Sequence, residues 1–291
     1  MELVQFEPFW VSLLTAVLER FKTLPSWMLL SLAMNGLLFL AVILSFRPKQ
    51  SISHSSESVL PRATAAITAE QETTPLVPQL GDRQYLAYQQ WVELLRQEAA
   101  AAEDAPRLTV LLGDSISLWF PNNLLPGRRT WLNQAISGER SDGLLQRLDG
   151  LDQAPVESFF VMIGINDLIA GRSEAQVTQN IANTVAYLQK RHPDAQIVVQ
   201  SVLPHSAANA TWEGRDRLLV LPNDRIQSVN RKLETIANDK DAYYLDLYPL
   251  FADGEGALRL DLTTDGLHLN ERGYLVWRTA IAVLLNTELE E

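Results

Sequence analysis

Five short apolar runs, each of the length of a β-strand, alternate with helical patterns along the C-terminal two thirds of the chain. The runs cover residues 108–112, 131–136, 158–163, 196–202 and 242–247. Apolar residues at three- and four-residue steps follow four of them and predict helices over residues 141–151, 173–191, 224–238 and 271–286, with another over 82–104 before the first run. Strands that are apolar nearly throughout need cover on both faces, so the alternation predicts a parallel sheet between layers of helices.

A charge-free stretch lies near the N-terminus. From Trp27 to Phe46 the chain has 20 residues without a charged side chain, and Arg47 and Lys49 follow directly. A helix needs about 20 apolar residues to cross a bilayer, so we expect a transmembrane helix over residues 25–47. A buried helix of the main domain and a cleaved signal peptide are the alternatives, although the stretch exceeds the usual apolar region of such a peptide.

The segments on either side of this stretch differ in character. Apolar side chains recur at helical steps within residues 1–24, which predicts an amphipathic helix at the membrane surface. Residues 48–81 are rich in Ser, Thr, Ala and Pro and predict a flexible linker, which leaves residues 82–291 for the main domain. Basic residues balance across the predicted single span and do not orient it, whereas the linker composition favours an extracytoplasmic domain.

The composition excludes several classes of function. The formal net charge of −11 argues against a nucleic-acid partner, because nucleic-acid-binding domains usually carry a basic face. The chain has no cysteine, which excludes disulfides, thiolate metal sites and a cysteine nucleophile.

The first apolar run ends in Gly113-Asp114-Ser115, directly before a predicted helix start. A serine at this point would lie with backbone N–H groups at the carboxyl edge of the sheet, where such sheets bind ligands. Gly, Asp and Ser are also common in turns and helix caps, so the motif alone leaves that alternative open. Polar segments follow the later strands too, namely Ser137-Gly138-Glu139-Arg140, Gly164-Ile165-Asn166-Asp167 and Pro204-His205, and Asp265 to Asn270 lead into the last helix.

A serine nucleophile needs a base, and the base needs an orienting partner. Of the four histidines, His54 lies in the predicted linker and His192 at a helix end, where a structural role is expected. His268 has Asp265 three residues earlier, a spacing that can bring a carboxylate to the imidazole; the alternative is a turn followed by a helix cap. His205 is the competing base but has no acid nearby in sequence, so we assign it to the pocket lining.

The tetrahedral intermediate of acyl transfer also needs hydrogen-bond donors aimed at its oxyanion. The backbone N–H groups of Ser115 and Gly138 and the side-chain amide of Asn166 are suitable groups. Taken singly, Gly138 and Asn166 are typical loop residues. Their joint placement after neighbouring strands favours an oxyanion hole.

Together, Gly113-Asp114-Ser115, Gly138, Gly164-x-Asn166-Asp167 and Asp265-x-x-His268 resemble, in order, the four sequence blocks of the GDSL/SGNH hydrolase superfamily of esterases, lipases and thioesterases. The stretch from Leu262 to Tyr274 is similar to the platelet-activating-factor acetylhydrolase-like branch, and Ala135 to Gly138 to the thioesterase I/lysophospholipase branch. The resemblance implies a three-layer α/β/α, flavodoxin-like fold with five parallel strands in the order 2-1-3-4-5. It implies Ser115 as nucleophile, His268 as base, Asp265 as its partner, oxyanion donors at Ser115, Gly138 and Asn166, and no metal or organic cofactor.

These observations predict a membrane-anchored serine esterase that acts on a small-molecule, lipid or glycan acyl ester. A catalytically inactive binding module or an envelope-assembly protein on the same fold is the alternative. Residues 206–222 hold Trp212 and Leu218 to Val220 between a strand and a helix. This segment is expected either to cover the acyl pocket as a lid or to pack as ordinary surface.

Overall fold

The computed structural model describes residues 86–289. The amphipathic helix, the transmembrane helix and the linker predicted over residues 1–24, 25–47 and 48–81 lie outside this range. Among the described residues, no helix has both the length and the apolar character that crossing a bilayer requires.

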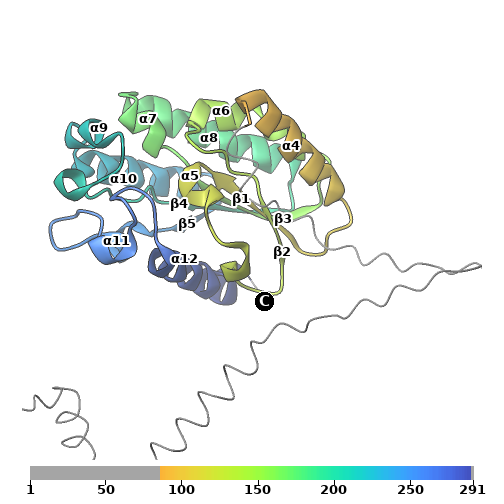
Figure 1. The fold of residues 1–291 in the computed structure, drawn as a ribbon. Helices are drawn as coiled ribbons and strands as arrows, with labels where there is room; N and C mark the ends of the chain where they lie inside the picture. The colour runs from red at the N-terminus through yellow and green to blue at the C-terminus, as the bar shows by residue number, and fades with distance from the viewer. Residues whose placement is uncertain (1–85, 290–291) are drawn as a thin grey trace, which may run out of the picture. The chain divides into compact units, whose positions relative to one another are not determined.

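A five-stranded sheet forms the centre of the described domain (Figure 1). Every neighbouring pair of strands is parallel, and the order is β2-β1-β3-β4-β5, as the family resemblance implied. In the register, Val110 of β1 lies between Leu132 of β2 and Phe159 of β3. The strands span Leu108–Gly113 (β1), Thr130–Asn133 (β2), Val156–Met162 (β3), Gln196–Gln200 (β4) and Tyr243–Leu245 (β5).

Helices cover both faces of the sheet, which confirms the layered α/β prediction. In Figure 1, α6, α8 and α10 lie along one face and α12 lies along the other. The long helices are α4 (Tyr88–Ala101), α8 (Glu174–Arg191), α10 (Asn223–Asp239) and α12 (Glu271–Leu284). The short ones are α5 (Ser115–Leu118), α6 (Ser141–Gln146), α7 (Ile165–Ile169), α9 (Arg215–Leu219) and α11 (Tyr248–Phe251).

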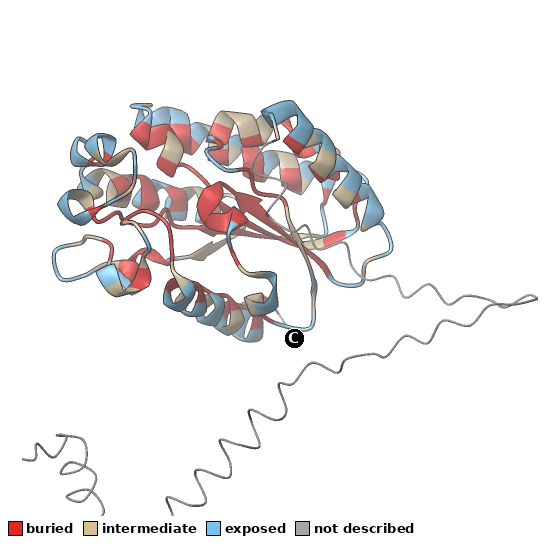
Figure 2. Cartoon of the chain, in the orientation of Figure 1, coloured by how far each residue is buried: buried red, intermediate tan, exposed pale blue. Residues whose placement is uncertain are grey.

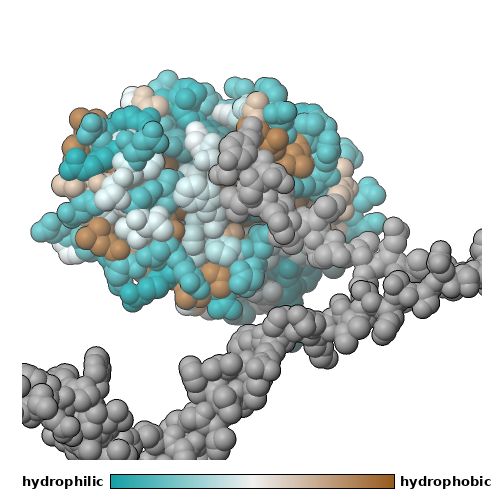
Figure 3. All heavy atoms as spheres, in the orientation of Figure 1, coloured by the Kyte–Doolittle hydropathy of each residue, from teal (hydrophilic) through white to brown (hydrophobic). Residues whose placement is uncertain are grey.

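The apolar core lies between the sheet and the helices on its two faces (Figure 2). All six residues of β1 are buried, and Phe159, Phe160 and Trp277 are fully enclosed. Burying one such side chain stabilises the fold by roughly 1.5–3 kcal/mol relative to leaving it in water. The Trp277 indole N–H donates to the Gln200 side-chain oxygen at 2.7 Å, so the one polar atom of this large ring is satisfied. In the view of Figure 3 the outer surface is mostly hydrophilic, with separate apolar patches.

The predicted elements are longer than the observed ones at several ends. The run 131–136 pairs as β2 only to Asn133, although the N–H groups of Gln134 and Ile136 still donate to carbonyls of β1. The helix predicted over 141–151 divides into α6 and a 3-10 turn at Leu148–Leu151. The division falls at Arg147, whose guanidinium turns inward to the buried carboxylate of Glu139.

Helix α4 precedes the alternating pattern of strands and helices and supports the carboxyl edge of the sheet. Trp91 and Leu95 of α4 form a separate apolar cluster with Leu118, Ala135 and Ile136, which belong to the segments after β1 and β2. The Gln134 amide also donates to the Leu95 carbonyl at 3.1 Å. The loops that follow β1 and β2 therefore rest on this helix.

Candidate active site

Ser115 begins α5, directly beyond the carboxyl end of β1. Asp114 caps this helix by accepting the Ile116 N–H at 3.0 Å. A Cβ at position 113 would lie 2.2 Å from the Ser117 hydroxyl oxygen and 2.4 Å from the Met162 carbonyl oxygen. The turn that presents Ser115 therefore needs glycine at position 113 because no side chain fits there.

A chain of hydrogen bonds joins Ser115, His268 and Asp265. The Ser115 Oγ lies 3.0 Å from His268 Nε2, and His268 Nδ1 lies 2.7 Å from Asp265 Oδ2. Since a carboxylate only accepts, the proton of the neutral ring belongs on Nδ1, which leaves Nε2 free to accept the serine proton. Burial raises the pKa of Asp265, but the hydrogen bonds from His268 and from the backbone N–H of Leu267 outweigh it and hold this pKa below its ordinary value.

The loop that carries Asp265 and His268 is fixed by its own backbone. Asp265 Oδ1 accepts the N–H groups of Leu267 and His268 at 3.0 and 2.8 Å. The His268 carbonyl accepts the Thr263 hydroxyl at 2.5 Å, which closes the loop at its base. Gly266 has φ +88°, a conformation that favours glycine, and a Cβ there would lie 2.5 Å from the Ala210 Cα.

The segment of residues 206–222 packs beside this loop. The Asp265 carbonyl accepts the N–H groups of Thr211 and Trp212 at 2.8 and 2.9 Å, and the Ser206 N–H donates to the Gly266 carbonyl at 2.8 Å. Leu218 of α9 is fully buried, whereas Val220 is 80% exposed. The segment thus braces the loop that holds Asp265 and His268; whether it also acts as a lid stays a prediction.

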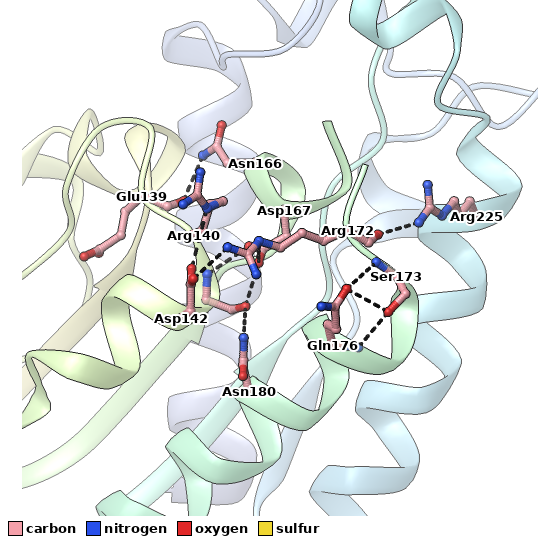
Figure 4. Close-up of polar contacts among 11 residues, drawn as sticks. Glu139, Arg140, Asp142, Asn166, Asp167, Arg172, Ser173, Gln176, Asn180 and Arg225 are labelled. Atoms are coloured by element: carbon pink, nitrogen blue, oxygen red, sulfur yellow. Dashed lines mark hydrogen bonds and ion pairs between the residues drawn. The ribbon is translucent and has the colours of Figure 1, made fainter. Parts of the chain in front are cut away.

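The two further predicted oxyanion donors lie on neighbouring loops. Gly138 follows β2, has φ +74° and is exposed, with no atom within 4 Å of where a Cβ would stand. Asn166 lies in α7 after β3, and its Nδ2 donates to the Glu139 carbonyl at 3.1 Å (Figure 4). This bond uses one of two amide hydrogens and ties Asn166 to the residue that follows Gly138, so both groups remain available at one edge.

A polar network behind Asn166 joins the same loops. Asp167 is fully buried and accepts the Ser141 N–H and hydroxyl at 2.8 and 2.7 Å, and the Asn180 amide donates to the Ser141 hydroxyl at 3.0 Å. Arg172 pairs with Asp142 at 2.7 Å (Figure 4). Burial raises the pKa of Asp167 above its ordinary value, although the bonds from Ser141 oppose this. Sequence reasoning gave none of these contacts, since they depend on how two loops meet.

Glu139 and Arg147 form a buried ion pair below the Gly138 loop. Two hydrogen bonds of 2.7 and 2.5 Å join the side chains, and the Tyr88 hydroxyl of α4 adds a third bond to Glu139 at 3.1 Å. Beside them is a hollow of about 430 Å³ lined by Tyr88, Ser137, Gly138 and residues of α6. The hollow adjoins a predicted oxyanion donor and is mostly polar.

Sequence reasoning also missed Trp119. Its indole ring lies against the His268 imidazole, with ring centroids 4.3 Å apart. The sequence feature that could have indicated this contact is the spacing of four residues between Ser115 and Trp119. That spacing places the two side chains one helical turn apart.

The other histidines of the described domain are held away from the Ser115 hydroxyl. His205 Nδ1 accepts the Ala207 N–H at 3.1 Å, and Nε2 contacts the Leu221 carbonyl at 2.7 Å, so both nitrogens are occupied. Burial lowers the pKa of His205 despite that carbonyl. His192 ends α8 and packs on Phe159, and burial lowers its pKa as well. Within residues 86–289, no group of three or more His, Asp or Glu side chains is arranged to hold a metal ion.

The sequence profile of the GDSL-like lipase/acylhydrolase family matches residues 111–276, which is more than half of the 291-residue chain. The chain belongs to this family. It is 25% identical over 193 residues to platelet-activating factor acetylhydrolase IB subunit alpha1 of Pongo abelii, a match that covers 63% of this chain and 78% of that protein. The human protein of the same name is 24% identical over 193 residues, with the same coverage of 63% and 78%.

Solved structures of other GDSL-like proteins share the fold. A putative platelet activating factor from Streptococcus pneumonia has a TM-score of 0.62 at 23% identity, covering 68% of this chain and 92% of that one. A GDSL-like lipase from Bacteroides thetaiotaomicron has a TM-score of 0.59 at 21% identity, covering 67% and 97%. As a GDSL-like acylhydrolase with a serine at the family position, the protein is a serine ester hydrolase.

Proposed function

We propose that the protein is a membrane-anchored serine esterase that hydrolyses carboxylic esters through an acyl-enzyme intermediate. The observation that carries the proposal is the hydrogen-bonded chain from Asp265 through His268 to Ser115, with contacts of 2.7 and 3.0 Å at the carboxyl edge of the sheet. Nucleophile, base and orienting acid stand in the order that general-base activation of a serine requires.

The reaction follows from the positions of these groups. His268 Nε2 takes the Ser115 proton while Oγ attacks the ester carbonyl carbon. The oxyanion that forms is stabilised by the N–H groups of Ser115 and Gly138 and by the Asn166 amide. When the intermediate collapses, the imidazolium returns its proton to the departing alcohol, and the acyl group remains on Ser115. A water molecule activated by His268 then releases the acid and restores the serine.

The hollow beside the proposed oxyanion donor Gly138 supports a substrate with a short acyl group. The hollow beside Gly138 is lined mainly by polar side chains, whereas the large apolar groove of the described domain, about 630 Å³, lies among α11, α12 and β5 and contains no residue assigned to catalysis. The related alpha1 subunits are named for an acetylhydrolase activity. We therefore propose O-acetyl or other short-acyl esters of lipid, glycan or small-molecule alcohols as the first class of substrate. Lysophospholipid-type esters, with their longer acyl chain, are the second class.

Membrane attachment is proposed from the N-terminal sequence. The 20 uncharged residues from Trp27 to Phe46 can cross a bilayer as one helix, and residues 48–81 would then tether the catalytic domain. The linker composition favours a location of this domain outside the cytoplasm. Sodium carbonate washing of isolated membranes should leave the full-length chain in the pellet. In intact cells, an added protease should cleave the linker; a domain degraded only after lysis would reject the extracytoplasmic location.

Ser115→Ala tests the chemistry. We expect this variant to lose hydrolysis of p-nitrophenyl acetate and labelling by a fluorophosphonate, with a melting temperature close to that of the wild type. Ser117→Ala is the matched control, because the Ser117 hydroxyl is buried in the same helix without a hydrogen-bond partner and should be dispensable. A Ser115→Ala variant with full activity would contradict the proposal, and a wild-type protein that neither turns over nor reacts with the inhibitor would favour the inactive binding module.

A further inference from the structure

The Trp119 side chain covers one face of the His268 imidazole. The ring centroids are 4.3 Å apart and the ring planes are inclined by 35°. Trp119 ends the nucleophile helix α5, and its N–H donates to the Ser115 carbonyl at 3.1 Å. Helix geometry therefore places the indole one turn beyond Ser115, on the side from which His268 approaches.

Trp119 differs from its neighbours in what it packs against. Leu118 and Phe120 are 7% and 2% exposed and belong to apolar clusters, whereas Trp119 is 39% exposed. The Trp119 side chain therefore contributes less to the core than those of Leu118 and Phe120, and its indole ring packs against His268. This makes Trp119 replaceable without a large loss of stability.

The hydrogen bonds of His268 leave one rotation of the imidazole unrestricted, and a stacked ring can restrict it. Asp265 holds Nδ1 at 2.7 Å and Ser115 holds Nε2 at 3.0 Å. Both contacts lie at the edge of the imidazole, so they fix the line between the nitrogens better than they fix the tilt of the ring about that line. A flat aromatic surface against the ring face restricts the tilt.

We propose that Trp119 is a positioning residue for His268, which fixes the tilt of the imidazole and stabilises the imidazolium formed when His268 takes the Ser115 proton. The face of an indole attracts a cation within about 6 Å of its centroid, and the attraction appears only when the ring becomes charged. The interaction therefore strengthens in the transition state, which raises kcat rather than substrate affinity. This inference rests on the proposed function, since it assigns a partner to the proposed base.

Other titratable groups near His268 are independent of Trp119. Asp265 lies on the same loop, Asp114 precedes Ser115, and the Tyr274 hydroxyl of α12 donates to the Ile116 carbonyl at 2.9 Å. None of these groups makes a hydrogen bond or ion pair with the Trp119 side chain. A substitution of Trp119 therefore changes the face of the imidazole while these groups stay in place.

Two substitutions in the full-length chain distinguish an effect of the aromatic face of Trp119 from an effect of apolar packing alone. Trp119→Phe keeps a π-face, and Trp119→Leu keeps an apolar side chain without one. With p-nitrophenyl acetate, we expect Trp119→Leu to lower kcat roughly five- to thirty-fold and Trp119→Phe to stay within about threefold of the wild type. Equal kcat values in all three proteins, with a change confined to KM, would overturn the proposal and assign Trp119 to substrate binding.

The NMR signals of the imidazole protons test the same idea without substrate. The His268 signals are assigned by their loss in His268→Asn, which separates them from those of the other three histidines. The indole ring lies against the imidazole, so its ring current should shift these signals in the wild type. Trp119→Phe should keep part of that shift and Trp119→Leu should lose it. His268 signals that are the same in the wild type and in Trp119→Leu would refute the proposal. If the wild type hydrolysed no ester, this measurement would still decide the role of Trp119. A failure of the positioning proposal can therefore be distinguished from a failure of the proposed esterase function.

Discussion

The Asp167 carboxylate accepts both the backbone N–H and the hydroxyl of Ser141, at 2.8 and 2.7 Å. Asp167 directly follows Asn166 after β3, and Ser141 begins α6 just beyond the loop that holds Gly138. The two proposed oxyanion donors from different strands therefore belong to one hydrogen-bonded unit.

Removing the Asp167 carboxylate should lower the stability of the fold. Asp167→Ala leaves the buried polar groups of Ser141 without their acceptor, and we expect a loss of about 1–3 kcal/mol in the free energy of unfolding, measured with urea. Asp142→Asn is the control: its partly exposed pair with Arg172 should contribute at most about 1 kcal/mol. Equal losses in the two variants would contradict the structural role of Asp167.

Asn166 should contribute to kcat rather than to KM. The amide would donate to the developing oxyanion, and removing one such donor costs roughly 10²- to 10³-fold in rate. We expect Asn166→Ala to show this loss with p-nitrophenyl acetate while KM changes little. A variant that retains more than about a third of the wild-type kcat would remove Asn166 from the oxyanion hole.

Asp265→Asn should lower kcat roughly 10³- to 10⁴-fold, because an amide does not hold the proton of His268 on Nδ1. Its hydrogen bonds keep the pKa of Asp265 below the ordinary value of 3.8, so this carboxylate stays charged where an imidazole titrates. The depressed pKa stabilises the fold above pH 4, and that contribution is lost as the pH falls through the folded-state pKa. Protonation of Asp265 should therefore contribute nothing to a change of wild-type activity above pH 5, which a pH–rate profile checks.

Asp114 should make stability fall with rising pH. Burial, with a smaller effect of the carboxylates of Glu139 and Asp167, raises its pKa from 3.8 to about 7, against the opposing hydrogen bond from the Ile116 N–H. Between these values the folded chain holds a proton that the unfolded chain releases, so this contribution is present below pH 4 and lost as the pH rises through 7. The free energy of unfolding of Asp114→Asn minus that of the wild type should therefore increase over this window. A difference independent of pH would contradict the raised pKa.

Gly266→Ala should disrupt the catalytic loop. The φ of +88° disfavours alanine, and the new Cβ would lie 2.5 Å from the Ala210 backbone, so we expect a loss of more than about 1 kcal/mol in stability together with most of the activity. Gly254→Ala is the matched control, because nothing lies within 4 Å of its Cβ position. Thermal unfolding and p-nitrophenyl acetate hydrolysis measure both effects.

The sheet could be predicted because its signal is local. The apolar runs 108–112 in β1 and 158–163 at the end of β3 are buried at every residue, so only a sheet covered on both faces accommodates them. The strand order was not contained in that pattern and came from the resemblance. Strand ends were overestimated at β2, β4 and β5, since their apolar runs continue into buried or partly buried loops that lack a full set of ladder bonds.

The parts of the site that could be named in advance are those held within short stretches of sequence. Asp265 and His268 are three residues apart, so one turn brings them together. The preference for His268 over His205 rested on that spacing, and the structure adds that both nitrogens of His205 are engaged elsewhere. Trp119, the Glu139–Arg147 pair and the Asp167–Ser141 unit depend on where separate loops meet in space, and such contacts have no signature in a single sequence.

Helix α4 sets a practical limit on how the enzyme can be shortened. The family profile begins at residue 111, yet Trp91 and Leu95 cover Leu118, Ala135 and Ile136 beside the active-site loops. A fragment cut at the family boundary would expose these apolar side chains to water and would leave the Glu139 carboxylate without the Tyr88 hydroxyl. Soluble production of the catalytic domain should therefore start before residue 86, which makes the unit of folding longer than the unit of homology.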